Sequence, residues 1–239
     1  MLAPLGLQTI VQPAFEYVAL DARVSDPAGY AKFEAAAAGD LVVFTSPRAV
    51  EHGLAQIPPA LLRRLRVAAI GPATAAALAA AGIPIAVSAG AGYTSEALLA
   101  ALVATQGATR ALEPQGQAFI VAAPGGRGAL LDGLLDLGWQ AFMLMVYRAE
   151  PALLDRAALA GLEAASGVLS IWTSGNAMQA LSQRLPPAAW LRLRRGEWLV
   201  ISERLQRLAR TWGPSRIHLA EGPGNSALLA AVHGLLGRG

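Results

Sequence analysis

Short runs of apolar residues alternate with longer segments of helical periodicity along most of the chain. Nearly every position in these runs is apolar, as in strands that helices cover on both faces of a sheet. The runs are Leu41–Phe44, Val67–Ile70, Phe119–Ala122 and Leu199–Ile201. The helices are expected to begin at Ser46, Pro72, Ser95 and Gly125, and a Ser-type cap is expected at Ser95. This alternation predicts βαβ units and an α/β fold with parallel sheets.

The pattern occurs twice in the chain. The matching blocks are 41–50 and 169–178, 67–82 and 198–213, and 95–102 and 225–232. In the second pair, one helix is expected to end at Gly82 and its counterpart at Gly213. A period of about 130 residues is too long for a solenoid and fits two copies of one domain. We therefore expect two similar doubly wound, flavodoxin-like domains.

A fourth match predicts how the two copies share the chain. Leu5–Gln8 and a strand expected at Thr9–Phe15 resemble Leu137–Gln140 and the strand expected at 141–147. This strand comes last in one copy, whereas its counterpart opens the chain. One domain is therefore expected to be discontinuous and to contain the other as an insertion.

The predicted boundaries follow from that arrangement. They are 22–143 for the inserted domain, 1–12 plus 152–239 for the discontinuous domain, and 13–21 and 144–151 for the two extended linkers. The strand and helix expected at Gln117–Leu137 have no counterpart in the discontinuous domain. We therefore expect that domain to lack one strand–helix unit; whether the native start lies upstream of Met1 is left open by the sequence.

Composition narrows the class of protein. Apolar residues make up 54% of the 239 residues and charged residues 15%, which is unlike a disordered chain. Glycine and proline interrupt the longest uncharged run, Val67–Ser95, so no membrane-spanning helix is expected. No signal-peptide pattern is recognised, and the expected location is the cytoplasm. Without cysteine and with only His52, His218 and His233, scattered and best explained as surface or structural residues, no metal site is expected.

The net charge is +3, from 19 basic and 16 acidic side chains. The densest arginine cluster, Arg192–Arg195 with Arg204–Arg210, is not a long basic block with interleaved aromatic residues. Arginines three residues apart are better explained as one solvated helix face. We therefore expect no nucleic-acid partner.

Several expected helices begin directly after a strand, with small or hydroxyl residues at the junction. Carboxyl ends of parallel strands share one sheet edge, where free N–H groups and the helix dipole favour anions. Arginine adds charge-assisted bonds to carboxylates. Each hydroxyl taken alone is also explained as a helix cap, but two domains presenting such edges favour a shared anionic ligand. The candidate binding residues are Thr45, Ser46, Arg48, Gly71, Thr74, Gly125, Gly126, Arg127, Thr173, Ser174, Gly175, Ser202 and Asn225.

Tyr147 is the polar aromatic residue at an expected linker. A phenol is uncharged at neutral pH and can donate a proton or a hydrogen bond. Phe15 occupies the matching position in the other copy, so the repeat does not itself require a hydroxyl there. A proton donor and a structural tyrosine both remain open.

Six blocks occur in a characteristic order. They are Val43–Val50, Ala69–Ala75, Pro124–Arg127, Val146-Tyr147, Thr173–Gly175 and Val200–Leu205. Together they resemble the uroporphyrinogen-III synthase family of the proteobacterial kind, from about Leu5 to the C-terminus. The resemblance implies a cofactor-free lyase of tetrapyrrole and haem biosynthesis. Such an enzyme closes hydroxymethylbilane with loss of water and inversion of ring D, giving uroporphyrinogen III.

The resemblance also carries expectations for the site. Tyr147 matches the tyrosine proposed in the family to assist departure of the hydroxyl. The substrate is a polycarboxylate, and the resemblance implies a monomer that receives it in a transient handover from hydroxymethylbilane synthase. The family's N-terminal strand and Thr-Arg-Pro-like turn have no counterpart here. The alternative from another class is a two-domain anion-binding module that closes on its ligand without catalysis.

Overall fold

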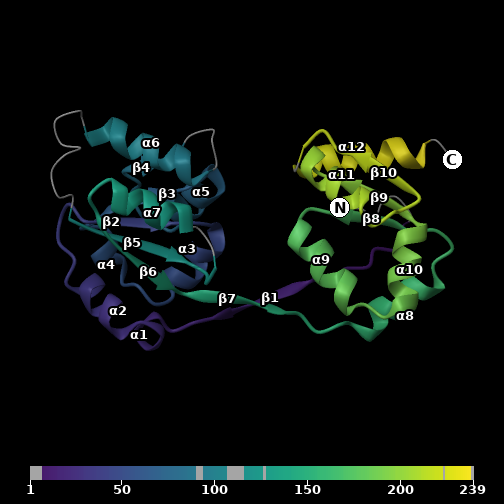
Figure 1. Cartoon of the computed structure of the whole chain (residues 1–239), viewed down its shortest axis with the longest axis horizontal. Coiled ribbons are helices and arrows are strands. Elements are labelled where there is room, and N and C mark those ends of the chain that lie inside the picture. The colour runs from purple at the N-terminus through teal and green to yellow at the C-terminus, as the bar shows by residue number, and fades with distance from the viewer. Residues whose placement is uncertain (1–6, 90–93, 107–115, 126–127, 223, 238–239) are drawn as a thin grey trace. The chain divides into compact units, whose positions relative to one another are not determined.

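The chain is described by a computed structural model over residues 7–89, 94–106, 116–125, 128–222 and 224–237. Contacts between its residues divide the chain into two compact units. Figure 1 shows the chain coloured by residue number, so each unit can be followed by its colours. The inserted unit is Tyr17–Ala149. The discontinuous unit comprises the described residues up to Glu16 and from Glu150 onward.

The inserted unit is built on a five-stranded sheet with the order β4-β3-β2-β5-β6. Its strands are β2 (Leu41–Phe44), β3 (Arg66–Ala69), β4 (Val87–Ser88), β5 (Gln117–Ala122) and β6 (Gln140–Met145). Every neighbouring pair is parallel, with Leu41 opposite both Arg66 and Ala118. Parallel sheets with strand–helix alternation confirm the predicted α/β class.

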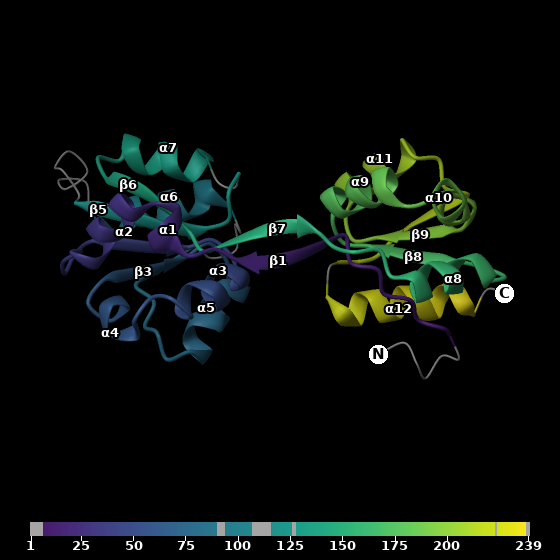
Figure 2. The same cartoon turned by 90° about the horizontal axis from the view of Figure 1, so that it is seen from below.

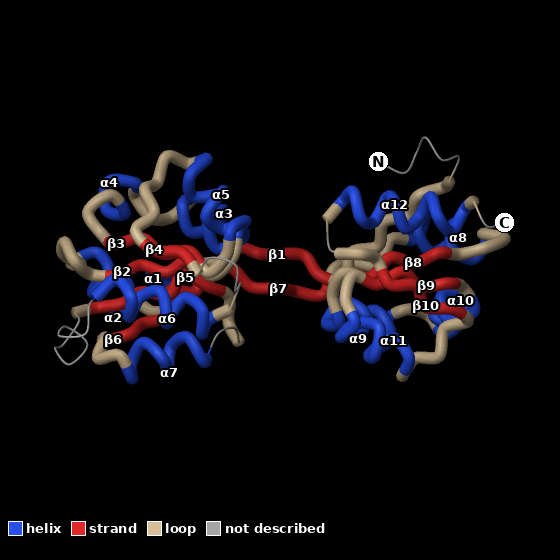
Figure 3. Tube along the Cα trace, turned by 90° about the horizontal axis from the view of Figure 1, so that it is seen from above, coloured by secondary structure: helices blue, strands red, loops and turns tan. Residues whose placement is uncertain are grey.

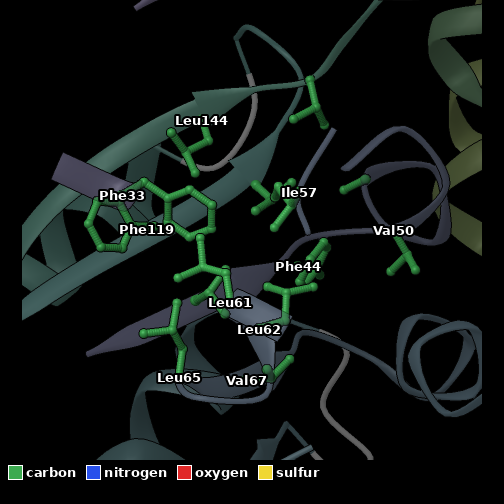
Figure 4. Close-up of a cluster of buried hydrophobic side chains, with 14 of the residues drawn as sticks. Phe33, Phe44, Val50, Ile57, Leu61, Leu62, Leu65, Val67, Phe119 and Leu144 are labelled. Carbon is green, nitrogen blue, oxygen red and sulfur yellow. The ribbon is translucent and has the colours of Figure 1, made fainter. Parts of the chain in front are cut away.

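Helices cover both faces of this sheet, as Figure 3 shows. They are α1 (Ala22–Ser25), α2 (Pro27–Glu34), α3 (Pro47–Leu54), α4 (Pro59–Leu62), α5 (Pro72–Ala80), α6 (Ser95–Gln106) and α7 (Gly128–Asp136). Side chains alternate along β2, so Phe44 packs beneath α3 while Val43 packs beneath α6 and α7. Figure 4 shows the first of these cores, where the rings of Phe33 and Phe119 meet edge-on at 5.0 Å.

The discontinuous unit has a three-stranded parallel sheet with the order β10-β9-β8. Its elements are α8 (Arg156–Ala164), β8 (Leu169–Trp172), α9 (Gly175–Arg184), α10 (Pro187–Arg195), β9 (Glu197–Val200), α11 (Glu203–Arg210), β10 (Arg216–Leu219) and α12 (Asn225–Leu236). Helices α9, α10 and α11 lie on one face and α12 on the other (Figure 2). Trp172, Trp190 and Trp198 form the centre of the larger core, with ring centroids 5.1 to 6.4 Å apart.

The last element is a two-stranded ribbon formed by β1 (Phe15–Ala19) and β7 (Tyr147–Pro151). The prediction of a strand at Thr9–Phe15 is wrong, because the described residues 7–13 contain no strand. Strand β6 occupies the matching place in the inserted unit, where β5 provides hydrogen-bond partners for its backbone. No described strand lies beside residues 7–13 to provide such partners there. Gln12 instead anchors this segment, accepting from the Asp155 N–H at 2.8 Å and donating to the Leu153 carbonyl at 3.2 Å.

Helix ends test the local predictions from the sequence. The predicted ends at Gly82 and Gly213 are confirmed, since both glycines follow the helix with positive φ, 69° and 67°. The predicted start at Gly125 is wrong, because Gly125 sits in a turn at φ 74° and α7 begins at Gly128. The predicted cap at Ser95 is also wrong, since Thr94 Oγ1 accepts the Ala97 N–H at 3.2 Å. No helix in the described ranges is long and apolar enough to cross a bilayer.

Candidate functional site

The carboxyl edge of the inserted sheet gathers the candidate residues of that unit. Phe44, the last residue of β2, lies opposite Ala69 of β3 and Val121 of β5. The junctions that follow these strands, at Thr45-Ser46, Gly71 and Gly125, therefore share one edge. Gly126 and Arg127 lie outside the residues that the structure describes.

Ser46 and Tyr147 are in direct contact at this edge. The Tyr147 hydroxyl lies 3.1 Å from Ser46 Oγ, although 101 positions separate the two residues. Ser46 is the N-cap of α3, and its Oγ accepts the Ala49 N–H at 3.0 Å. A hydroxyl carries one proton, so Ser46 can donate to the phenol oxygen and leave the Tyr147 proton free for another acceptor.

Two aromatic rings contact Tyr147, and an arginine joins the cluster through one of them. The His52 ring stacks on Tyr147 with centroids 5.2 Å apart and planes 18° apart, and Tyr17 meets it edge-on at 5.9 Å. The Arg48 guanidinium lies 4.2 Å from the centroid of Tyr17 and 3.4 Å from Glu51. Sequence reasoning missed Tyr17 and treated His52 as a surface or structural residue. A signal was present, since Arg48 and His52 are four residues apart and share a face of α3.

The two threonines of this edge are buried. Thr45 is 8% exposed and donates its hydroxyl to the Val121 carbonyl at 3.0 Å, which ties the end of β2 to β5. Thr74 is 3% exposed in the first turn of α5, whose N-cap is Gly71. The Thr45 hydroxyl is thus taken up by the backbone of the edge, whereas the hydroxyl of Tyr147, a residue that is also 8% exposed, contacts Ser46.

The discontinuous unit repeats the arrangement at its own carboxyl edge. Ser174 and Ser202 are N-caps whose Oγ atoms accept the N–H groups of Ala177 and Leu205, each at 3.3 Å. Pairing of β8 with β9 places Thr173, Ser174 and Gly175 beside the junction at Ser202. Thr173 is exposed.

Two further candidates in this unit have different surroundings. Gly175 is buried, and a Cβ there would come within 2.9 Å of Leu208, so glycine allows α9 to approach α11. Asn225 is exposed at the first position of α12, where Gly224 is the N-cap.

The chemistry of the Tyr147 site follows from these contacts. It offers an uncharged proton donor, a serine that links it to a helix N-terminus, and an arginine within the same cluster. Within the described ranges, no group of three His, Cys, Asp or Glu side chains is placed to hold a metal ion. This set suits protonation of a leaving group and recognition of a carboxylate.

Comparison with known proteins gives a family match. The model described as "Uroporphyrinogen-III synthase HemD" matches residues 2–230. The fold resembles a triple mutant of the uroporphyrinogen III synthase of the extremely thermophilic bacterium Thermus thermophilus, with TM-score 0.59 and 20% identity over 98% of this chain and 92% of that one. It also resembles the enzyme of Helicobacter pylori, with TM-score 0.57 and 17% identity over 83% and 84%. No curated protein matches the sequence.

Proposed function

Because this chain belongs to the uroporphyrinogen-III synthase family, we propose that Tyr147 is the proton donor of the family's cyclisation. The enzyme is a lyase of porphyrin biosynthesis that closes hydroxymethylbilane with loss of water and inversion of ring D. The observation that carries the proposal is the 3.1 Å contact between Tyr147 and the helix cap Ser46.

The proposed step is the departure of the terminal hydroxyl. Tyr147 donates its proton to the hydroxymethyl oxygen, the carbon–oxygen bond breaks, and water leaves. The pyrrole nitrogen lone pair supports the electron-poor carbon that remains. Ring closure then inverts ring D: the new bond forms at the α-carbon that holds the methylene bridge, the bond to that bridge breaks, and the bridge bonds to the other α-carbon. The proton that this second α-carbon loses returns to the phenolate.

Ser46 orients the donor in this proposal. In the proposed arrangement the Ala49 N–H occupies one lone pair of Ser46, and the Ser46 hydroxyl donates to the phenol oxygen, which leaves the phenol proton free for the substrate. Each donor in such a chain strengthens the next. Because this chain of hydrogen bonds starts at the positive end of the α3 dipole, it also stabilises the developing phenolate.

Recognition of the substrate is proposed to use both sheet edges. The linear tetrapyrrole is a polycarboxylate, and backbone N–H groups at helix N-termini together with arginine suit such anions. The proposed set is Thr45, Ser46, Arg48, Gly71, Thr74, Gly125, Gly126, Arg127, Thr173, Ser174, Gly175, Ser202 and Asn225. We further propose a monomer that acts in the cytoplasm and receives its substrate from hydroxymethylbilane synthase.

Removing one hydroxyl tests the donor. Tyr147→Phe is expected to lower kcat for uroporphyrinogen III about 100-fold, the lower end for loss of a general acid, with KM nearly unchanged. Tyr17→Phe is the matched control, because it removes a neighbouring phenol hydroxyl while keeping the ring that packs on Tyr147. Steady-state kinetics with freshly generated hydroxymethylbilane measures both. Full activity of Tyr147→Phe would contradict the proposal and would show that Tyr147 has a structural role only.

A further inference from the structure

Gln56, two residues beyond the end of α3, contacts segments far apart in the sequence through its side-chain amide. Its Nε2 carries two protons, which are shared among the carbonyls of Leu20 at 2.6 Å, Val146 at 3.3 Å and His52 at 3.3 Å. Its Oε1 accepts the Ala22 N–H at 3.0 Å. The Leu20 N–H also donates to the Val146 carbonyl at 3.0 Å. One side-chain amide therefore links α3 to the residues that directly follow β1 and directly precede β7.

Arg184 makes the corresponding contacts in the discontinuous unit. It ends α9 and lies 128 residues after Gln56, the same offset that relates Ser46 to Ser174. Its Nη1 and Nη2 donate to the carbonyls of Ala14 at 3.3 Å and Ala152 at 2.6 Å.

The carbonyl partners are themselves repeat-related. Ala14 and Ala152 stand in the same relation to Arg184 as Val146 and Leu20 do to Gln56, and the Ala152 N–H donates to the Ala14 carbonyl at 3.1 Å. Each unit therefore holds its end of the ribbon with one long polar side chain from the repeat-related helix.

We propose that Gln56 is a positioning residue for Tyr147. The Val146 carbonyl that it holds belongs to the peptide unit joining Val146 to Tyr147, and His52, whose carbonyl it also holds, stacks on the Tyr147 ring. Gln56 therefore fixes the backbone of Tyr147 and of the helix that carries Ser46 with one side chain. The equivalent Arg184 lies beside Phe15, which has no hydroxyl, so its clamp holds the ribbon without orienting a proton donor. This inference rests on the proposed role of Tyr147.

Gln56→Met tests the proposal, because methionine keeps the length of the side chain and removes its hydrogen bonds. We expect kcat to fall about tenfold with KM within about twofold, since misplacing a reacting group by about 1 Å costs up to 100-fold. Gln56→Arg, which copies the clamp of the other unit, is expected to recover most of that loss. Arg184→Met is the matched control and is expected to keep kcat within about twofold. Thermal unfolding of each variant confirms that it is folded before kinetics.

The Tyr147→Phe background separates the two proposals. If Gln56 acts through the Tyr147 hydroxyl, Gln56→Met causes no further loss of kcat there, whereas Arg184→Met has the same small effect in both backgrounds. An equal tenfold loss in both backgrounds, or an unchanged kcat in Gln56→Met, would overturn the positioning role. Full activity of Tyr147→Phe alone would instead overturn the proposed donor.

Discussion

The two units share one repeat but close their sheets differently. Strand β2 of the inserted unit lies between β3 and β5, whereas its counterpart β8 pairs with β9 and, in the described part of the chain, with no strand on its other edge. Leu41 and Val43 of β2 are completely buried, while Leu169 and Ile171 of β8 are half-buried. The same strand–helix pattern therefore gives a full core in one unit and a partial core in the other.

The second face of the discontinuous sheet shows the consequence most clearly. Helix α12 covers it where α6 and α7 together cover the equivalent face of the inserted unit. Among the described residues, this face buries Leu199, Ala220 and Val232, against fourteen residues on the equivalent face of the inserted unit. Full burial of a large apolar side chain contributes about 1.5–3 kcal/mol, so the discontinuous unit is expected to be the less stable one. A repeat in sequence thus does not imply equal stability.

The largest expected effect is a separation of the two units in unfolding. All tryptophans except Trp139 belong to the discontinuous unit, so Trp139→Phe makes tryptophan fluorescence report that unit alone. In urea, the fluorescence transition is expected at a lower concentration than the loss of far-ultraviolet circular dichroism from the inserted unit. Coincident transitions in that variant would show that the units unfold as one, and would contradict the lower stability of the discontinuous unit.

A smaller effect, on the urea unfolding midpoint, is expected at alkaline pH and in the inserted unit only. Burial raises the pKa of Tyr30, an effect larger than the lowering by Arg23. The unfolded chain therefore loses this proton first, at about pH 10, and the stabilising contribution of neutral Tyr30 is lost as the pH rises further. The unfolding midpoint of the inserted unit should fall above pH 10. All four tyrosines lie within Tyr17–Ala149, so the discontinuous unit lacks this contribution.

Tyr30→Phe is the control for this measurement. It keeps the buried ring and removes the titrating group together with its 3.3 Å hydrogen bond to the Gln56 carbonyl. Urea midpoints at pH 8 and pH 10.5, followed by circular dichroism, should differ less in this variant than in the wild type. An equal pH dependence in both proteins would assign the effect to other groups.

Local signals in the sequence predicted most of the buried strands and several helix ends. Gly82 and Gly213 mark helix ends because a left-handed backbone is easiest for glycine, and the apolar runs mark buried strands. The strand expected at Thr9–Phe15 failed because a strand needs a neighbour, and apolar patterning does not say whether one is present.

The site depends on contacts that no local pattern contains. Ser46 was found as a helix cap and Tyr147 as a polar aromatic, but their contact joins positions 101 residues apart. The stacking of His52 and the hydrogen bonds of Gln56 were missed, because both depend on where the ribbon strands leave the sheet. The repeat could have pointed to Gln56, since Arg184 occupies the same place in the other copy.

Product analysis tests the central claim that this chain is a synthase whose proton donor is Tyr147. Freshly generated hydroxymethylbilane is incubated with the folded protein, and the oxidised uroporphyrin isomers are separated by chromatography. The wild type should give mainly the type III isomer, while Tyr147→Phe should give mainly type I from spontaneous closure. Type I alone from the folded wild type would contradict the claim.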